Sequence, residues 1–127
     1  MDNYQYYYFD NKTICIITDI NTGEKFVGEA TWDGTGTYNQ AIGENIASKR
    51  AIINSLRTYR EAARLQYKNL QIMLTDMAQR KDFDPKSYEV KQIKKLMWDQ
   101  KATIDELNSF IRQDKNALHF YIGVRCK

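Results

Sequence analysis

The chain has 127 residues and a formal net charge of +3, with 19 basic side chains against 16 acidic ones. A chain of this length supports a modest hydrophobic core, so we expect residues 1–127 to form a single domain. No apolar run approaches the ~18 residues of a membrane span. The N-terminus MDNYQYYYFD lacks the basic start and apolar run of a secretory signal, which leads us to expect a cytosolic protein.

The two cysteines and the single histidine argue against a metal centre. Cys15 lies in an apolar run and Cys126 is the penultimate residue, so no CxxC pair exists from which a four-ligand zinc site could be built. We expect both thiols to be structural or bystander groups, and we expect the protein to need no cofactor.

The first third of the chain predicts antiparallel β-structure. Residues 4–9, 13–19 and 25–32 read YQYYYF, TICIITD and KFVGEATW, which are rich in β-branched and aromatic side chains. Between the last two, Gly23 can take the positive φ of a hairpin turn. The tyrosine run could stack nucleobases, but packing on one face of the sheet is the interpretation that its strand propensity favours.

From residue 38 onward the period changes to that of a helix. Thr37 and Gln40 match a capping box. The 4-3 spacing that follows predicts one helix of about 40 residues, roughly 60 Å long, whose seam needs a partner helix. The expected seam positions are Ile42, Ile46, Lys49, Ile53, Leu56, Arg60, Ala63, Tyr67, Leu70, Leu74 and Met77.

A second helix is predicted after Asp84-Pro85, because aspartate can cap a helix and proline suits its first position. The two helices should form an antiparallel hairpin over residues 38–113, with residues 81–83 at the tip. The second seam consists of Val90, Ile93, Met97, Gln100, Ile104, Leu107 and Ile111.

The last segment, residues 117–126 (ALHFYIGVRC), is aromatic and β-branched, and we expect it to return as a strand to the sheet of residues 4–32. The expected fold is therefore α+β, with the order βββααβ.

The glycine-containing loop before the first helix, DGTGTYN, carries no nucleotide-binding motif. Asn39 stands where the third glycine of GxGxxG should be, and the GK[ST] of a phosphate-binding P-loop is absent. Free N–H groups at the start of the helix could attract an anion, but the side chain of Thr37 is expected to accept a hydrogen bond from one of them. We interpret the loop as a corner between strand and helix.

Charge is concentrated on the first long helix. Residues 39–80 contain seven basic and three acidic side chains, a balance of +4 that leaves −1 for the rest of the chain. Arg50, Arg57 and Arg64 repeat every seven residues beside the seam, and Arg60 lies in it. Guanidinium groups suit phosphate oxygens, although arginines beside a helical seam more commonly solvate it or pair across it.

Catalytic motifs are absent from the sequence. His119, in the expected final strand, is the only histidine, and the sequence has no serine or cysteine motif for which it would act as a general base. We interpret it as a structural histidine. Asp105 and Glu106 are adjacent on a helix and point apart, so they do not form an acid pair. We expect a protein that is not an enzyme.

Residues 28–51 carry a recognisable pattern. It consists of Gly28 and Ala30 at the end of a strand, then Asp33 and Tyr38 in a polar loop. The pattern continues on the helix with Gly43, Ala47, Arg50 and Ala51. With the chain length, the N-terminal sheet and the helical hairpin, this pattern resembles the Thoeris anti-defence sponges of phages. The motif covers about a fifth of the chain.

That resemblance implies a phage protein that acts in the cytoplasm of the infected bacterium. Such a protein sequesters cyclic ADP-ribose isomers made by TIR-domain immune enzymes, without cleaving them, and it assembles as a homodimer or higher oligomer with nucleotide pockets between subunits. In such a ligand the pyrophosphate needs guanidinium groups, the two riboses need polar side chains, and the adenine needs an aromatic ring to stack on. Our candidate ligand-binding residues are Arg50, Arg57, Arg60, Phe83 and Arg112.

Two other classes of function stay open. A binder of cyclic oligonucleotides or nucleic acid would use the same arginines and the tyrosine run, and polymer binding would depend steeply on salt. A coiled-coil inhibitor of protein interactions would use the helical seam alone.

Overall fold

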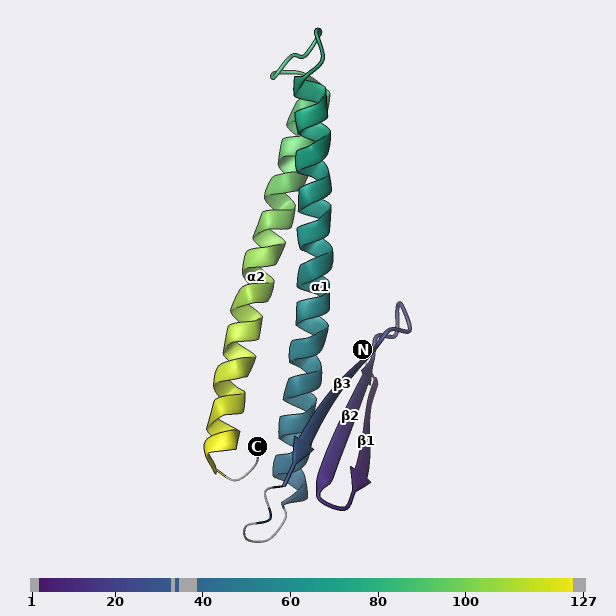
Figure 1. The fold of residues 1–127 in the computed structure, drawn as a ribbon, viewed down its shortest axis with the longest axis vertical. Coiled ribbons are helices and arrows are strands. Elements are labelled where there is room, and N and C mark those ends of the chain that lie inside the picture. The colour runs from purple at the N-terminus through teal and green to yellow at the C-terminus, as the bar shows by residue number, and fades with distance from the viewer. Residues whose placement is uncertain (1–2, 33, 35–38, 125–127) are drawn as a thin grey trace. The chain divides into compact units, whose positions relative to one another are not determined.

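The computed structural model describes residues 3–32, 34 and 39–124, with side chains described up to residue 119. Its fold is α+β, and the two long helices form an antiparallel hairpin, as predicted (Figure 1). The three expected strands and both expected helices are present. In chain order the elements are β1 (Asn3–Phe9), β2 (Lys12–Thr18), β3 (Lys25–Thr31), α1 (Gln40–Ala78) and α2 (Tyr88–Val124).

The three strands form one antiparallel sheet in the order β1-β2-β3. Phe9 pairs with Lys12, so β1 and β2 are joined by a two-residue turn in which Asp10 has a φ of 42°. Gly23 has a φ of 75° in the turn between β2 and β3 and donates its N–H to the carbonyl of Asp19 at 2.8 Å. The prediction that Gly23 supplies a positive φ is confirmed.

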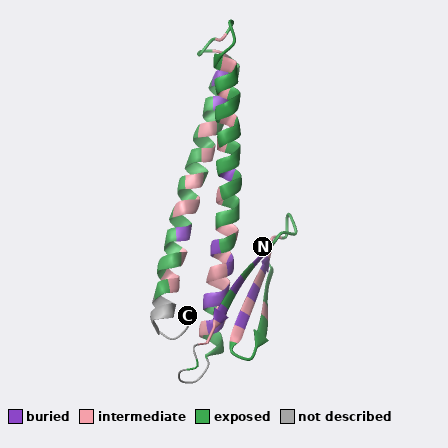
Figure 2. Ribbon diagram, in the orientation of Figure 1, coloured by how far each residue is buried: buried purple, intermediate pink, exposed green. Residues whose placement is uncertain are grey.

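Burial alternates along β2 and β3, because successive side chains of a strand point to opposite faces (Figure 2). On one face Cys15, Ile17 and Ala30 are buried against the first turns of α1. The helix presents two alanines there, Ala47 and Ala51, as well as Ile46. Small side chains on both partners let the sheet and the helix approach closely.

Gly28 marks the point of closest approach between β3 and α1. A Cβ atom built on Gly28 would lie 2.9 Å from the carbonyl carbon of Arg50, and closer still to the carbonyl oxygen of Ala47 and the amide nitrogen of Ala51. All three are backbone atoms, which cannot move aside as a flexible side chain can. Packing therefore explains Gly28, Ala30, Ala47 and Ala51 of the pattern in residues 28–51.

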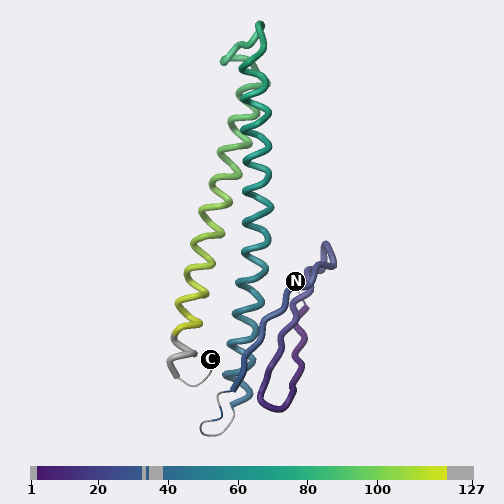
Figure 3. Tube along the Cα trace, viewed as in Figure 1, coloured from purple at the N-terminus to yellow at the C-terminus, as the bar shows by residue number. Residues whose placement is uncertain are grey.

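The chain divides into two compact units. The first contains residues 1–57 and 110–127, and the second contains residues 58–109. The second unit is a pair of antiparallel helical segments with their connecting loop (Figure 3). Across both units, every expected seam position of α1 and α2 is buried or half-buried.

Within the second unit the buried stripe is narrow. Gln100, the polar interruption of the second seam, donates its side-chain N–H to Oε1 of Gln66 at 2.7 Å. Nearly every other position of this unit is exposed. The exposed set includes several large apolar side chains, namely Leu65, Ile72, Met73, Tyr88, Leu96 and Trp98.

The starts of the helices differ in detail from the prediction. Thr37 lies outside the described residues, and Asn39 caps α1 by accepting the N–H of Ile42 on its Oδ1 at 3.2 Å. Asp84 caps only a turn, through the N–H of Lys86 at 2.9 Å. Helix α2 starts three residues beyond Pro85, where Ser87 Oγ accepts the N–H of Val90 at 3.4 Å.

The prediction of a C-terminal strand over residues 117–126 was wrong. Residues 117–124 continue α2 without a break, and residues 125–127 lie outside the described part. Leu118 packs against the buried cluster around Cys15 and Ile46 from this helix. The strand propensity of the segment is overridden, because tertiary packing of Leu118 is available in the helical conformation and the helix is already nucleated by its preceding turns.

No described helix is apolar enough over sufficient length to cross a membrane.

Candidate anion-binding cavity

A cavity with a volume of about 650 Å³ lies within the first unit. It is bordered by the middle of β3, by the part of α1 that follows Ala47 and by the last described turns of α2. Its walls combine cationic, amide and apolar side chains. The lining residues are Val27, Gly28, Glu29, Arg50, Ile53, Asn54, Arg57, Lys115, Leu118 and His119.

Two polar side chains of α1 are held in place by the backbone of β3. Arg50 donates from Nη1 to the carbonyl of Glu29, and Asn54 donates from Nδ2 to the carbonyl of Val27, both at 2.6 Å. These carbonyls flank Gly28, where strand and helix are closest. The close approach therefore brings α1 side chains within reach of β3 and fixes the direction in which Arg50 and Asn54 project.

The other basic side chains of the cavity have no such partner. Arg57, Lys115 and His119 are exposed, and within the described part of the chain none of them makes an ion pair or a side-chain hydrogen bond. The one carboxylate in the lining belongs to Glu29, whose Oε2 lies 3.4 Å from Nζ of Lys12. The lining thus has an excess of positive charge.

The α2 wall of the cavity is held by polar and apolar contacts to α1 and the sheet. Lys49 Nζ lies 3.2 Å from Oδ1 of Asp114, and both side chains are partly buried, which strengthens such a pair relative to an exposed one. Leu118 packs on the core cluster four residues later. Lys115 and His119, each one residue beyond one of these anchors, project from neighbouring turns of one helix face.

Arg60 occupies the seam of the second unit, as its heptad position predicted. Its Nη1 donates to Oδ1 of Asn108 on α2 at 3.0 Å, and its Nε lies 3.6 Å from Oε1 of Glu61. Glu61 also pairs with Arg64 at 2.7 Å. Arg60 is not among the residues that line the cavity. The partner of Arg60 on the second helix is therefore an asparagine.

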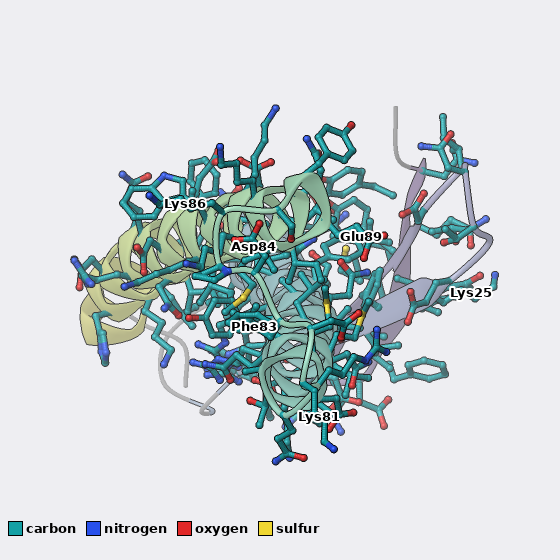
Figure 4. All side chains as sticks on the ribbon, turned by 90° about the horizontal axis from the view of Figure 1, so that it is seen from above. Lys25, Lys81, Phe83, Asp84, Lys86 and Glu89 are labelled. Atoms are coloured by element: carbon teal, nitrogen blue, oxygen red, sulfur yellow. The ribbon has the colours of Figure 1, made fainter. Side chains whose placement is uncertain are left out.

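Phe83 lies at the tip of the hairpin, together with Lys81, Asp84 and Lys86 (Figure 4). Its side chain is half-buried and borders a small cavity of about 250 Å³ that also includes Met77, Arg80 and Val90. Its N–H bonds to the carbonyl of Arg80 at 3.2 Å, which shapes the loop.

Of the five candidate residues, Arg50 and Arg57 line the same cavity, whereas Arg112 is exposed on α2 and does not line it. Sequence reasoning missed Asn54, Lys115 and His119. The prediction that His119 lies in a strand was wrong, since it is an exposed residue of α2. The Lys115 and His119 spacing of four was a helical signal that the expected strand concealed.

Two tyrosines of β1, Tyr6 and Tyr8, lie beside titratable groups. Tyr8 donates a hydrogen bond to the carboxylate of Glu44, and the side chain of Gln40 donates another. The two hydrogen bonds lower the pKa of Glu44. Burial, followed by the proximity of Cys15, raises the pKa of Tyr6, and burial likewise raises the pKa of the Cys15 thiol. Cys15 is fully buried, as a structural thiol should be.

Among the described residues there is no group of three or more His, Cys, Asp or Glu side chains that could hold a metal ion. Comparison of the chain with protein-family models, with curated proteins and with solved structures found no match.

Proposed function

We propose that this protein captures a small anionic nucleotide in the cavity of its first unit and holds it without chemical change. The observation that supports the proposal is the lining itself, in which Arg50, Arg57 and Lys115 outnumber one carboxylate that is already paired with Lys12. A group of cations in one concave site, in which Arg57 and Lys115 make no ion pair among the described residues, is stabilised by a bound phosphate.

The nucleotide that we propose is a cyclic ADP-ribose isomer. This choice rests on the resemblance of residues 28–51 to the Thoeris anti-defence sponges and on the agreement of a pyrophosphate with the cationic lining. The protein would then act in the cytoplasm of an infected bacterium. By lowering the concentration of the free signal, it would keep the downstream immune effector inactive.

A sponge must release its ligand slowly and must not consume it. We therefore propose a binding protein rather than an enzyme. The rigid anchoring of Arg50 and Asn54 on β3 suits this role, because side chains that are already ordered lose less entropy on binding.

We further propose that the ligand site is completed by a second copy of the chain. The second unit exposes large apolar side chains such as Leu65, Ile72 and Trp98, which a partner hairpin would cover. In a two-fold assembly, Phe83 of one copy would stack on the adenine held by the other.

Calorimetric titration with cyclic ADP-ribose isomers tests the proposal. We expect tight binding of at least one isomer, and we expect heat denaturation of the complex to release the isomer with its mass unchanged. Release of a cleaved product would contradict sequestration. Absence of heat with every isomer, from a folded and oligomeric sample, would move the proposal to cyclic oligonucleotides.

Two variants test the site. Arg57→Ala removes an exposed cation of the cavity, and Phe83→Ala removes the aromatic plane. We expect each to weaken capture by about tenfold or more without unfolding the protein. Lys68→Ala, which removes an exposed cation of α1 outside the cavity, is the matched control. Unchanged affinity in both variants would refute this site.

An alternative function is inhibition of a protein partner by the helical hairpin, and the exposed Leu65, Ile72 and Trp98 favour it. The two functions differ in what Arg57→Ala does. A hairpin inhibitor would keep its activity in that variant, whereas a nucleotide sponge would lose it. Binding of long DNA or RNA with a steep dependence on salt would instead indicate a nucleic-acid protein.

A further inference from the structure

The cavity has two cationic sides that come from different helices. Arg50 and Arg57 belong to α1, whereas Lys115 and His119 belong to α2. We infer that the cavity takes a ligand with two phosphate groups, one for each helix, and that Lys115 and His119 bind the second phosphate. The inference rests on the proposed function of the cavity as a nucleotide site, and it assigns a role to two residues outside the resemblance.

The spacing of the cations favours an extended ligand. Arg50 and Arg57 are separated by seven residues, or roughly 10 Å along α1, and Lys115 and His119 by four residues, or roughly 6 Å along α2. A single phosphate is only a few ångströms across, whereas the cavity has a volume of about 650 Å³ and basic side chains from two helices. Two linked phosphates would place one charged group against each helix.

The charge of the lining also matches a diphosphate. Arg50, Arg57 and Lys115 carry three positive charges, and Glu29 carries one negative charge that is already shared with Lys12. A diphosphate neutralises this excess more fully than a monophosphate does.

The apolar part of the lining indicates that the cavity does not recognise a nucleobase. Val27, Ile53 and Leu118 provide it, and no Phe, Tyr or Trp side chain occurs among the described lining residues. An aromatic plane is the usual means of holding a base. Discrimination inside this cavity should therefore depend on the number of phosphates and little on the base.

Titration of the full-length protein with inorganic pyrophosphate and with inorganic phosphate, at constant ionic strength, tests the inference. We expect pyrophosphate to bind at least about tenfold more tightly than phosphate. Lys115→Gln should weaken pyrophosphate binding by about 10- to 100-fold and phosphate binding much less. Lys95→Gln, an exposed lysine of α2 outside the cavity, should change neither.

His119→Gln tests the other residue of the α2 side of the cavity. Glu29, Arg50, Arg57 and Lys115 are the charged side chains that share its cavity among the described residues. We expect His119→Gln, like Lys115→Gln, to weaken pyrophosphate binding more than phosphate binding, because both side chains lie on the α2 side.

Equal binding of phosphate and pyrophosphate, or pyrophosphate binding that Lys115→Gln and His119→Gln leave unchanged, would overturn the inference. Failure here can be told from failure of the proposed function. If cyclic ADP-ribose isomers bind to the wild type, and Lys115→Gln and His119→Gln bind them equally well, the proposed sequestration is supported and the second phosphate site is refuted. If pyrophosphate binds as expected and no cyclic ADP-ribose isomer binds, the diphosphate site is supported, but its ligand is a different diphosphate.

Discussion

At the scale of the residue, Gly28 has the clearest structural role. Its missing side chain lets β3 lie against the backbone of α1, and that contact brings Arg50 and Asn54 onto the carbonyls of Glu29 and Val27. A packing position thus also orients two polar side chains of the cavity.

Gly28→Ala should destabilise the protein strongly. The added methyl group would overlap backbone atoms of Ala47, Arg50 and Ala51, so strand and helix must separate. We expect a loss of about 3 kcal/mol in the free energy of unfolding, at the upper end of overpacking effects. Urea denaturation measures it, with the neighbouring, partly exposed Val27→Ala as control, for which a loss under about 1 kcal/mol is expected. A near-neutral Gly28→Ala would show that the close approach is wrong.

The hydrogen bond from Tyr8 to Glu44 predicts a dependence of stability on pH. Because this bond lowers the pKa of Glu44 below its ordinary value of 4.5, it stabilises the fold above that pH and its contribution is lost as the carboxylate is protonated. Tyr8→Phe should therefore be less stable than the wild type at pH 7, and the difference should shrink as the pH falls below 4.5. Tyr7→Phe is the control within the same strand, and a pH-independent difference for Tyr8→Phe would contradict the assignment.

At the scale of the element, the start of α2 shows how a cap is chosen. Both Asp84 and Ser87 are good capping residues, and proline suits either the first helical turn or a preceding turn. In the structure Asp84 closes the turn over Lys86 and Ser87, and Ser87 then caps the helix. The sequence contained both signals but could not rank them.

Ser87→Ala should lower the free energy of unfolding by about 1 kcal/mol, the usual cost of losing a cap. Ser109→Ala, in the body of the same helix, should have a much smaller effect because it removes no cap. Urea denaturation of both variants makes the comparison. Equal effects of the two substitutions would place the start of α2 elsewhere.

The helical seams were predictable to the residue, because a 4-3 repeat over many turns admits one solution. The segment from Ala117 to Val124 was not. Its aromatic and β-branched residues favour a strand in isolation, yet it follows a helix that needs no new nucleus and it packs Leu118 on the core.

At the scale of the whole molecule, the exposed apolar side chains of the second unit predict self-association. Ile72 and Met73 are each 50 % exposed, and Trp98 is 75 % exposed. Sedimentation equilibrium should give a mass that is a multiple of the 15.0 kDa chain. Trp98→Glu should lower that mass, whereas Lys95→Glu, which changes an already polar exposed position, should not. A monomeric wild type would exclude a site shared between copies.

The sequence alone determined the three strands and the two long helices, but not the conformation of residues 117–124, since periodicity, turn glycines and strand propensity are local properties. It also singled out the arginines of α1, two of which line the cavity. Only the tertiary structure decided which other residues join them. Asn54, Lys115 and His119 become neighbours of Arg50 through the approach of β3 at Gly28 and the anchoring of α2 by Asp114 and Leu118. Such contacts between residues far apart in the chain leave no periodic trace in the sequence.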